Sequence, residues 1–232
     1  MSEMPNHPPH PSGSAAHLLP QGEKGAFSDP GTDLALYVHW PYCARICPYC
    51  DFNVVRDRGK AAEQAALTEA ILADMEAQAA LTGPRRLASI FLGGGTPSLM
   101  APEAVAAVIA RARTLFPSSG EIEITLEANP TDAEAARFAA LSDAGVNRLS
   151  MGVQALDDAA LAFLGRNHSA DEARRAVVAA GRVFDRLSID LIYARPGQTV
   201  DGWTASSRLW RSLLTGFGLN PVRSGSRPSA SR

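Results

Sequence analysis

The chain has 232 residues, of which 46% are hydrophobic, and it carries a formal net charge of −2 at pH 7. This length and apolar content suffice for one buried core, and the near-neutral charge gives no reason to expect a nucleic-acid partner. No apolar run is long enough to span a bilayer, and the N-terminus lacks a charged-then-apolar signal pattern. We therefore expect a soluble cytoplasmic protein.

Residues 1–33 are rich in Pro, Gly, Ser and His without periodicity, which predicts a disordered leader. From Leu34 onward, short β-type runs alternate with Ala-rich helical stretches. The expected strands are 34–40, 87–95, 121–129, 148–154 and 186–193, and the expected helices are 61–83, 101–116, 132–145, 169–184 and 200–214.

This alternation indicates an α/β fold with right-handed βαβ units and a parallel sheet, and it fits a doubly wound sheet or a partial barrel equally well. Ser169 with Glu172 forms a capping-box pattern at the start of one helix, and Gly145 stands where a helix is expected to end. In either architecture, functional groups are expected at the carboxyl ends of the strands.

All three cysteines, Cys43, Cys47 and Cys50, lie in "YCARICPYCDFN", directly after the first expected strand. An odd, clustered set of cysteines argues against a disulfide framework. One alternative is a Cys₃His zinc site with His39, but His39 alternates with Tyr37 along the strand and is expected to point elsewhere. Three incidental buried cysteines are disfavoured by the spacing. The third alternative is a four-iron cluster held through three irons, with the fourth iron open to an outside ligand.

The C-x₃-C-x₂-C spacing, with the aromatic Tyr49 before the third cysteine, resembles the cluster loop of the radical S-adenosylmethionine (SAM) superfamily. The resemblance implies a [4Fe-4S] cluster on Cys43, Cys47 and Cys50. It also implies that the amino and carboxylate groups of SAM chelate the open iron. An electron from the reduced cluster would then release methionine and a 5′-deoxyadenosyl radical.

"FLGGGTPSL" (91–99) follows at the end of the second expected strand and resembles the glycine-rich segment of that superfamily. Glycines there permit close approach of the backbone to a ligand, although a plain strand-to-helix turn would have the same composition. By the resemblance, Gly94, Gly95 and Thr96 would hold the methionine end of the cofactor.

Polar residues stand at the later strand ends: Glu127 in "LEANP", Gln154 in "SMGVQ" and Asp190 in "SIDLIY". A carboxylate within a buried strand has to be paired, so Asp190 indicates either an internal salt bridge or a functional role. Arg166, in "LGRNHS", is either a solvated loop charge or a guanidinium suited to a carboxylate such as that of methionine.

Taken together, these segments resemble the oxygen-independent coproporphyrinogen III oxidase family and its heme-chaperone branch, HemW, over roughly residues 34–210. The resemblance implies a partial (β/α)₆ barrel. The oxidases carry a further cysteine two places after the third cluster cysteine, and Phe52 occupies that position here, which favours the HemW-like branch. By motif, the cofactor-contacting positions are Tyr37, Tyr49, Gly94, Gly95, Thr96, Glu127, Gln154, Arg166 and Asp190.

The function predicted from this resemblance is heme binding and delivery to a hemoprotein acceptor. Its cofactors would be the [4Fe-4S] cluster, SAM and heme, and it would need an electron donor for the cluster. Any membrane contact would come only through the acceptor. The alternatives are an enzyme that oxidatively decarboxylates coproporphyrinogen III, or an inactive fragment of either protein.

Residues 202–232 contain five Arg and no Asp or Glu, and the chain finishes as "NPVRSGSRPSASR". We therefore expect an incomplete radical SAM core over 34–215, lacking its last strand and a C-terminal domain, and a non-family basic tail over 216–232. A shifted reading frame near codon 215 would produce such a tail. The strand at 186–193 would then form an exposed sheet edge that can pair with other chains.

Overall fold

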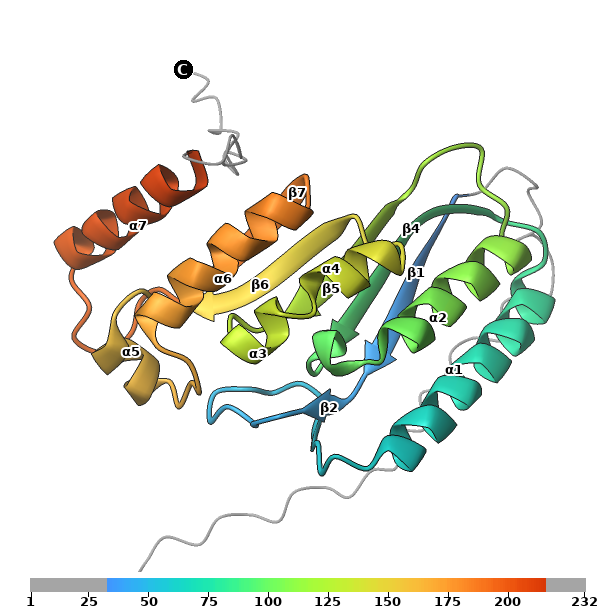
Figure 1. Ribbon diagram of the computed structural model, residues 1–232, viewed down its shortest axis with the longest axis horizontal. Helices are drawn as coiled ribbons and strands as arrows, with labels where there is room; N and C mark the ends of the chain where they lie inside the picture. The colour runs from blue at the N-terminus through green and yellow to red at the C-terminus, as the bar shows by residue number, and fades with distance from the viewer. Residues whose placement is uncertain (1–32, 216–232) are drawn as a thin grey trace, which may run out of the picture.

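The structure is a computed structural model that describes residues 33–215. The predicted leader and basic tail therefore lie outside the described residues, apart from Asp33. The described elements are β1 (Asp33–Trp40), β2 (Tyr42–Cys43), β3 (Val55–Arg56), α1 (Ala61–Thr82), β4 (Arg86–Gly94), η1 (Pro97–Leu99), α2 (Pro102–Leu115), β5 (Glu123–Ala128), α3 (Asp132–Ala135), α4 (Phe138–Asp143), β6 (Arg148–Gln154), α5 (Asp158–Phe163), α6 (Ala170–Val183), β7 (Arg186–Leu191) and α7 (Val200–Thr215) (Figure 1).

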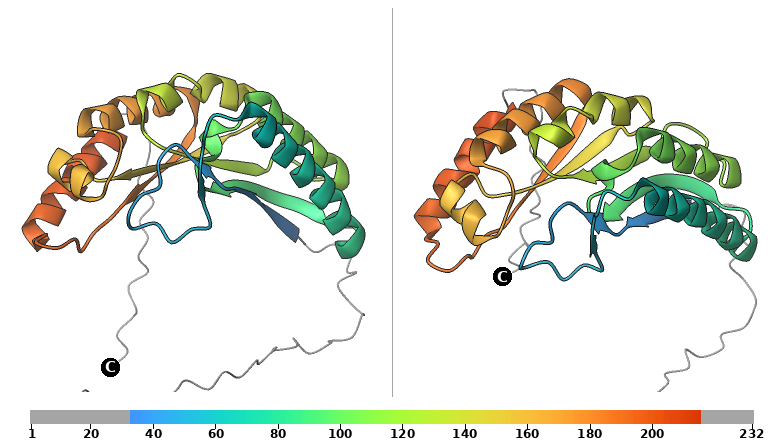
Figure 2. Two further views of the ribbon diagram at one scale, coloured as in Figure 1. Left: turned by 90° about the horizontal axis from the view of Figure 1, so that it is seen from below. Right: turned by 60° about the horizontal axis from the view of Figure 1, so that its bottom comes forward.

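The main sheet has five parallel strands in the order β1-β4-β5-β6-β7, so each strand pairs with the next long strand along the chain. A doubly wound sheet would reverse this order and carry helices on both faces. Figure 2 instead shows an arch, with the helices along its convex face. The α/β fold is therefore confirmed as a partial barrel, and in the described part of the chain β7 is its last strand.

The core lies between the sheet and the helices, and the strand alternation explains it. On β6, the side chains of Leu149, Met151 and Val153 are fully buried and face the helices, where residues such as Val177 of α6 complete the core. No helix among residues 33–215 is both long enough and apolar enough to cross a membrane.

The opposite, concave face of the sheet is polar across β5, β6 and β7. Glu123 on β5 forms ion pairs of 2.7 Å with Arg148 on β6 and with Arg186 on β7. The hydroxyl of Ser188 donates to that of Ser150 at 3.2 Å. These contacts tie β5, β6 and β7 together near their amino ends, so this part of the concave side is built from polar groups rather than from a second apolar layer.

The expected strands and helices are confirmed, with one helix divided. The predicted helix at 132–145 is split into α3 and α4, because the Arg137 N–H closes a turn onto the Glu134 carbonyl at 2.9 Å. The Arg137 guanidinium also donates to the Met100 carbonyl at 2.6 Å. The capping box of Ser169 and Glu172 is present at α6, and Gly145 follows α4 with φ of 107°.

Candidate functional site

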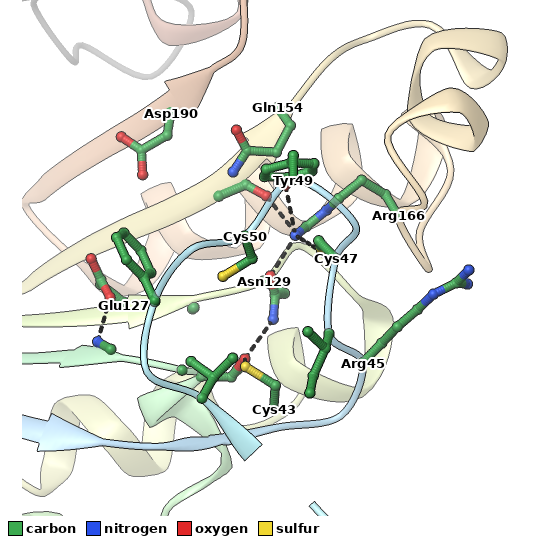
Figure 3. Close-up of a pocket in the computed structure, with 18 of the residues that line it drawn as sticks. Cys43, Arg45, Cys47, Tyr49, Cys50, Glu127, Asn129, Gln154, Arg166 and Asp190 are labelled. Atoms are coloured by element: carbon green, nitrogen blue, oxygen red, sulfur yellow. Dashed lines mark hydrogen bonds between the residues drawn. The ribbon is translucent and has the colours of Figure 1, made fainter. Parts of the chain in front are cut away.

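A cavity of about 130 Å³ opens where the carboxyl ends of β4, β5, β6 and β7 meet the cysteine loop. It is lined by the three cysteines and by every predicted cofactor-contacting residue except Tyr37 (Figure 3). These residues come from separate segments of the chain, which the parallel sheet brings to one edge. The lining includes Cys43, Cys47, Tyr49, Cys50, Gly94, Gly95, Thr96, Glu127, Gln154, Arg166 and Asp190.

Tyr37 is the predicted residue that the fold does not bring into this cavity. Its side chain is 57% exposed and stacks on Phe91, with ring centroids 6.0 Å apart. Burial raises the pKa of Tyr37, and the negative charge of the nearby Glu127 raises it further. Tyr37 is therefore a neighbour of the cavity wall rather than part of it.

The cysteine loop is held by backbone pairing rather than by helix or disulfide. Cys43 lies on β2, which pairs with β3, and the Cys50 N–H donates to the Cys47 carbonyl at 3.0 Å. His39 Nε2 donates to the Asn53 carbonyl at 2.9 Å, so this imidazole braces the far end of the loop. It does not line the cavity, which argues against the Cys₃His alternative.

Only Cys43 of the three thiols is buried. Burial is the main cause that raises the pKa of the Cys43 thiol. A hydrogen bond from the Thr96 hydroxyl lowers the pKa, and the neighbouring Cys50 and Cys47 raise it. Within residues 33–215, no three His, Cys, Asp or Glu side chains are gathered closely enough to hold one metal ion. Cys43, Cys47 and Cys50 all line one cavity, and a four-iron cluster would place each of their thiolates on a different iron.

The glycine-rich segment packs directly against the chain that leads into the cysteine loop. A Cβ atom on Gly95 would lie 2.6 Å from the Tyr42 carbonyl oxygen and 2.8 Å from that of Pro41. The N–H groups of Gly95 and Thr96 donate to the carbonyls of Trp40 and Tyr42, at 2.7 and 2.8 Å. The protein's own packing therefore accounts for the lack of a side chain at Gly95, and these N–H groups are already engaged.

Arg166 connects several parts of the site. Its Nη1 donates to Cys47 Sγ at 3.2 Å and to the Tyr49 hydroxyl at 3.4 Å, and its Nη2 donates to the Gly152 carbonyl at 2.8 Å. Gly165 allows this approach, because its φ is 68° and a Cβ atom there would lie 2.6 Å from Pro48 Cδ. The alternative that Arg166 is a solvated loop charge is therefore excluded.

Two carboxylates face the cavity from β5 and β7 (Figure 3). Burial raises the pKa of Glu127. The Gly94 N–H, which donates to it at 3.1 Å, lowers that pKa, and the charge of Asp190 raises it. Asp190 is exposed on the edge strand, so the expectation that it lies within a buried strand is wrong. Partial desolvation raises its pKa, Arg148 lowers it, and within residues 33–215 Asp190 forms no salt bridge.

Two polar residues that were not predicted from the sequence, Asn129 and Glu134, organise the site. Asn129 lines the cavity, with Nδ2 donating to Thr96 Oγ1 at 3.0 Å and Oδ1 accepting from Arg166 Nη2 at 2.5 Å. Glu134, 4% exposed, accepts from the Asn129 N–H at 2.7 Å and from the Ser98 hydroxyl. Asn129 lies within "LEANP", the segment that also contains Glu127, and Glu134 follows it by four residues, so polar residues at this strand end are the sequence signal for both.

Comparison with known proteins identifies the family. The family model described as the radical SAM superfamily matches residues 37–208. Radical S-adenosyl methionine domain-containing protein 1, mitochondrial, of Bos taurus is 47% identical over 176 residues, which cover 75% of this chain and 39% of that protein. Heme chaperone HemW of Escherichia coli is 38% identical over 169 residues, which cover 72% of this chain and 44% of that protein.

The solved structure of coproporphyrinogen III oxidase (HemN) from Escherichia coli matches with a TM-score of 0.70 and 27% identity, covering 79% of this chain and 42% of that one. The chain thus spans less than half the length of the curated relatives named above. The superfamily implies a [4Fe-4S] cluster and SAM. The chain belongs to the radical SAM superfamily and fits its HemW-like branch.

Proposed function

We propose that the chain holds a [4Fe-4S] cluster on Cys43, Cys47 and Cys50, binds SAM in the adjoining cavity, and acts in heme binding and delivery to hemoproteins. The observation that carries the proposal is the cavity itself, where three thiols meet a glycine-rich segment, a guanidinium and two carboxylates. The heme role rests on the relatives that are named heme chaperones.

The residues around the cavity suit the groups of SAM. The Arg166 guanidinium suits the methionine carboxylate, which would take the place of the Tyr49 hydroxyl, the longest of its contacts at 3.4 Å. Because the N–H groups of Gly95 and Thr96 are engaged within the protein, the glycine segment would offer carbonyl oxygens, which are the acceptors that the methionine amino group needs. Glu127 and Asp190 could accept from the ribose hydroxyls. The bound cluster would supply one electron for cleavage of the sulfonium, and the protein residues would hold and orient the cofactor.

The second candidate function is oxidative decarboxylation of coproporphyrinogen III. The structural similarity to the Escherichia coli oxidase favours it. Phe52 argues against it, because the family resemblance implies a further cysteine at this position in the oxidases.

The heme-delivery proposal also requires a hemoprotein acceptor and an electron donor for the cluster. We place this function in the cytoplasm, although the related proteins of Bos taurus and Mus musculus are named mitochondrial.

The cluster is tested by anaerobic reconstitution of the full chain. We expect about four irons per chain and the broad visible absorption of thiolate-bound iron. Replacing any one of Cys43, Cys47 or Cys50 by Ala should remove most of both. Bound zinc without iron uptake would overturn the proposal.

The two candidate functions are separated with the iron-loaded protein. It is incubated with SAM, a reductant and coproporphyrinogen III, and separately titrated with heme. The chaperone proposal expects heme binding and no porphyrin product. Formation of protoporphyrinogen would replace it with the oxidase function.

A further inference from the structure

A continuous chain of side-chain hydrogen bonds joins two of the three cysteines through three different loops (Figure 3). From Cys43, it runs through the Thr96 hydroxyl (3.6 Å from Sγ), Asn129 (3.0 Å) and Arg166 (2.5 Å), and it ends at Cys47 Sγ, 3.2 Å from the guanidinium. Asn129 is its middle member, and it contacts neither sulfur directly.

The chemistry of each group fixes the direction of these hydrogen bonds. The Arg166 guanidinium has only donors, so it must meet the carbonyl oxygen of the Asn129 side chain. The Asn129 amide nitrogen then faces Thr96 and donates to its oxygen. A hydroxyl that accepts this hydrogen bond is free to direct its own hydrogen elsewhere, and the Cys43 sulfur lies within reach.

The backbone of Asn129 is fixed as well. Its N–H donates at 2.7 Å to the buried carboxyl group of Glu134, which also accepts from Ser98. The carboxamide is therefore held at both ends, by its own backbone and by the two side chains that it contacts. These contacts fix the Asn129 side chain between Thr96 and Arg166.

We propose that Asn129 is a positioning residue that orients two hydrogen-bond donors, Thr96 and Arg166, toward the sulfurs of Cys43 and Cys47, and that it thereby raises the reduction potential of the bound cluster. The inference rests on the proposed function, since it needs a cluster on these cysteines. Hydrogen bonds to the sulfurs stabilise the more negative, reduced state, which is how they tune the potential of an iron–sulfur cluster.

An aspartate at this position would reverse the effect with little change of shape. Its carboxylate cannot donate, so the Thr96 hydroxyl would turn toward it and away from Cys43. The carboxylate would also form an ion pair with Arg166 and weaken the interaction of the guanidinium with Cys47. Both changes lower the potential of the cluster.

The test uses the full chain, reconstituted anaerobically with iron and sulfide, and compares wild type, Asn129→Asp, Thr96→Val and the double variant. Thr96→Val removes the hydroxyl donor without adding charge. The exposed Asn167→Asp, next to Arg166, controls for an added surface charge. The measurement is the ratio of reduced to oxidised cluster at a fixed applied potential, read by electron paramagnetic resonance.

For Asn129→Asp, we expect this ratio to fall about tenfold, a shift of about 59 mV for a one-electron couple. Thr96→Val should also lower the ratio of reduced to oxidised cluster. The double variant should shift less than the sum of the two, since both remove the same donor to Cys43. Asn167→Asp should leave the ratio near the wild-type value.

Equal ratios in wild type and Asn129→Asp would overturn the inference while leaving the proposed function in place. Fully additive shifts would also overturn it, because Asn129 would then not act through Thr96. If Asn129→Asp takes up no iron, Thr96→Val decides alone, and a wild-type ratio in that variant overturns the inference. A wild-type chain that takes up no iron would overturn both.

Discussion

Arg166 is the residue at which the proposed cofactor site can be probed most sharply, because its charge and its forked shape can be removed separately. Arg166→Ala removes both, and Arg166→Lys keeps the charge but loses the planar pair of donors. In the structure, one nitrogen serves Cys47 and Tyr49 and the other serves Asn129 and Gly152. A single ammonium group cannot reproduce this arrangement.

The expected magnitude follows from the hydrogen bonds that are lost. A hydrogen bond to a charged group contributes about 1.5–3 kcal/mol, and about 1.4 kcal/mol corresponds to a tenfold change in Kd. Loss of one such bond to the methionine carboxylate should therefore raise the Kd for SAM by about 10-fold to 150-fold in Arg166→Ala. Arg166→Lys should show a smaller increase. Because Arg166 also contacts Cys47, the Ala variant should retain less iron.

The assay is equilibrium titration of iron-loaded protein with SAM, expressed per loaded cluster so that iron loss does not count as weaker binding. Arg45→Ala is the matched control. Arg45 belongs to the same cavity rim, and Figure 3 shows its side chain extending away from Arg166. An Arg166→Ala protein that binds SAM as tightly as wild type would refute the assignment of this guanidinium to the carboxylate.

Three further predictions concern stability, measured by urea unfolding. Gly95→Ala should cost about 1–3 kcal/mol, because the new methyl group would meet the Tyr42 carbonyl; Gly120→Ala, which meets nothing within 4 Å, should stay near wild type. Ser169→Ala should cost about 1 kcal/mol through loss of the α6 cap, and an unchanged midpoint would contradict that reasoning. Burial raises the pKa of Glu134, so stability should fall as pH rises from the ordinary glutamate pKa through the raised one. Glu134→Gln should flatten that part of the profile, and a slope equal to wild type would show that Glu134 is not its source.

The strands and most helices could be predicted from the sequence because their signals are local. The β6 alternation of Leu149, Met151 and Val153 with polar residues determines which face of the strand is buried. Ser169 and Glu172 mark the start of α6 within four residues. The short helix α5 was missed although Asp157 caps it and Gly165 follows it, because its six residues are too few to show helical periodicity.

The contacts inside the site could not be predicted in the same way, because they join residues far apart in the chain. Arg166 meets Cys47, 119 positions away, only when the α5–α6 loop packs against the cysteine loop. The exposure of Asp190 depends on the curvature of the sheet and on the position of β7 at its edge. Motif resemblance indicated which residues surround the cavity, but it did not indicate which of them contact one another.

The edge strand β7 shows how a local interpretation changes once its neighbours are known. From the sequence, this strand is predicted to be an apolar edge that can pair with other chains. In the structure, Leu187 and Ile189 pack against the core from the convex side, whereas Arg186 and Asp190 are exposed. Charged side chains on an edge strand disfavour pairing with a second chain, because they would have to be desolvated or brought next to like charges. Pairing of the β7 edge with other chains stays a prediction, and Arg186 and Asp190 are the residues that would weaken it. Both side chains also belong to the concave face: Arg186 pairs with Glu123, and Asp190 lines the cavity.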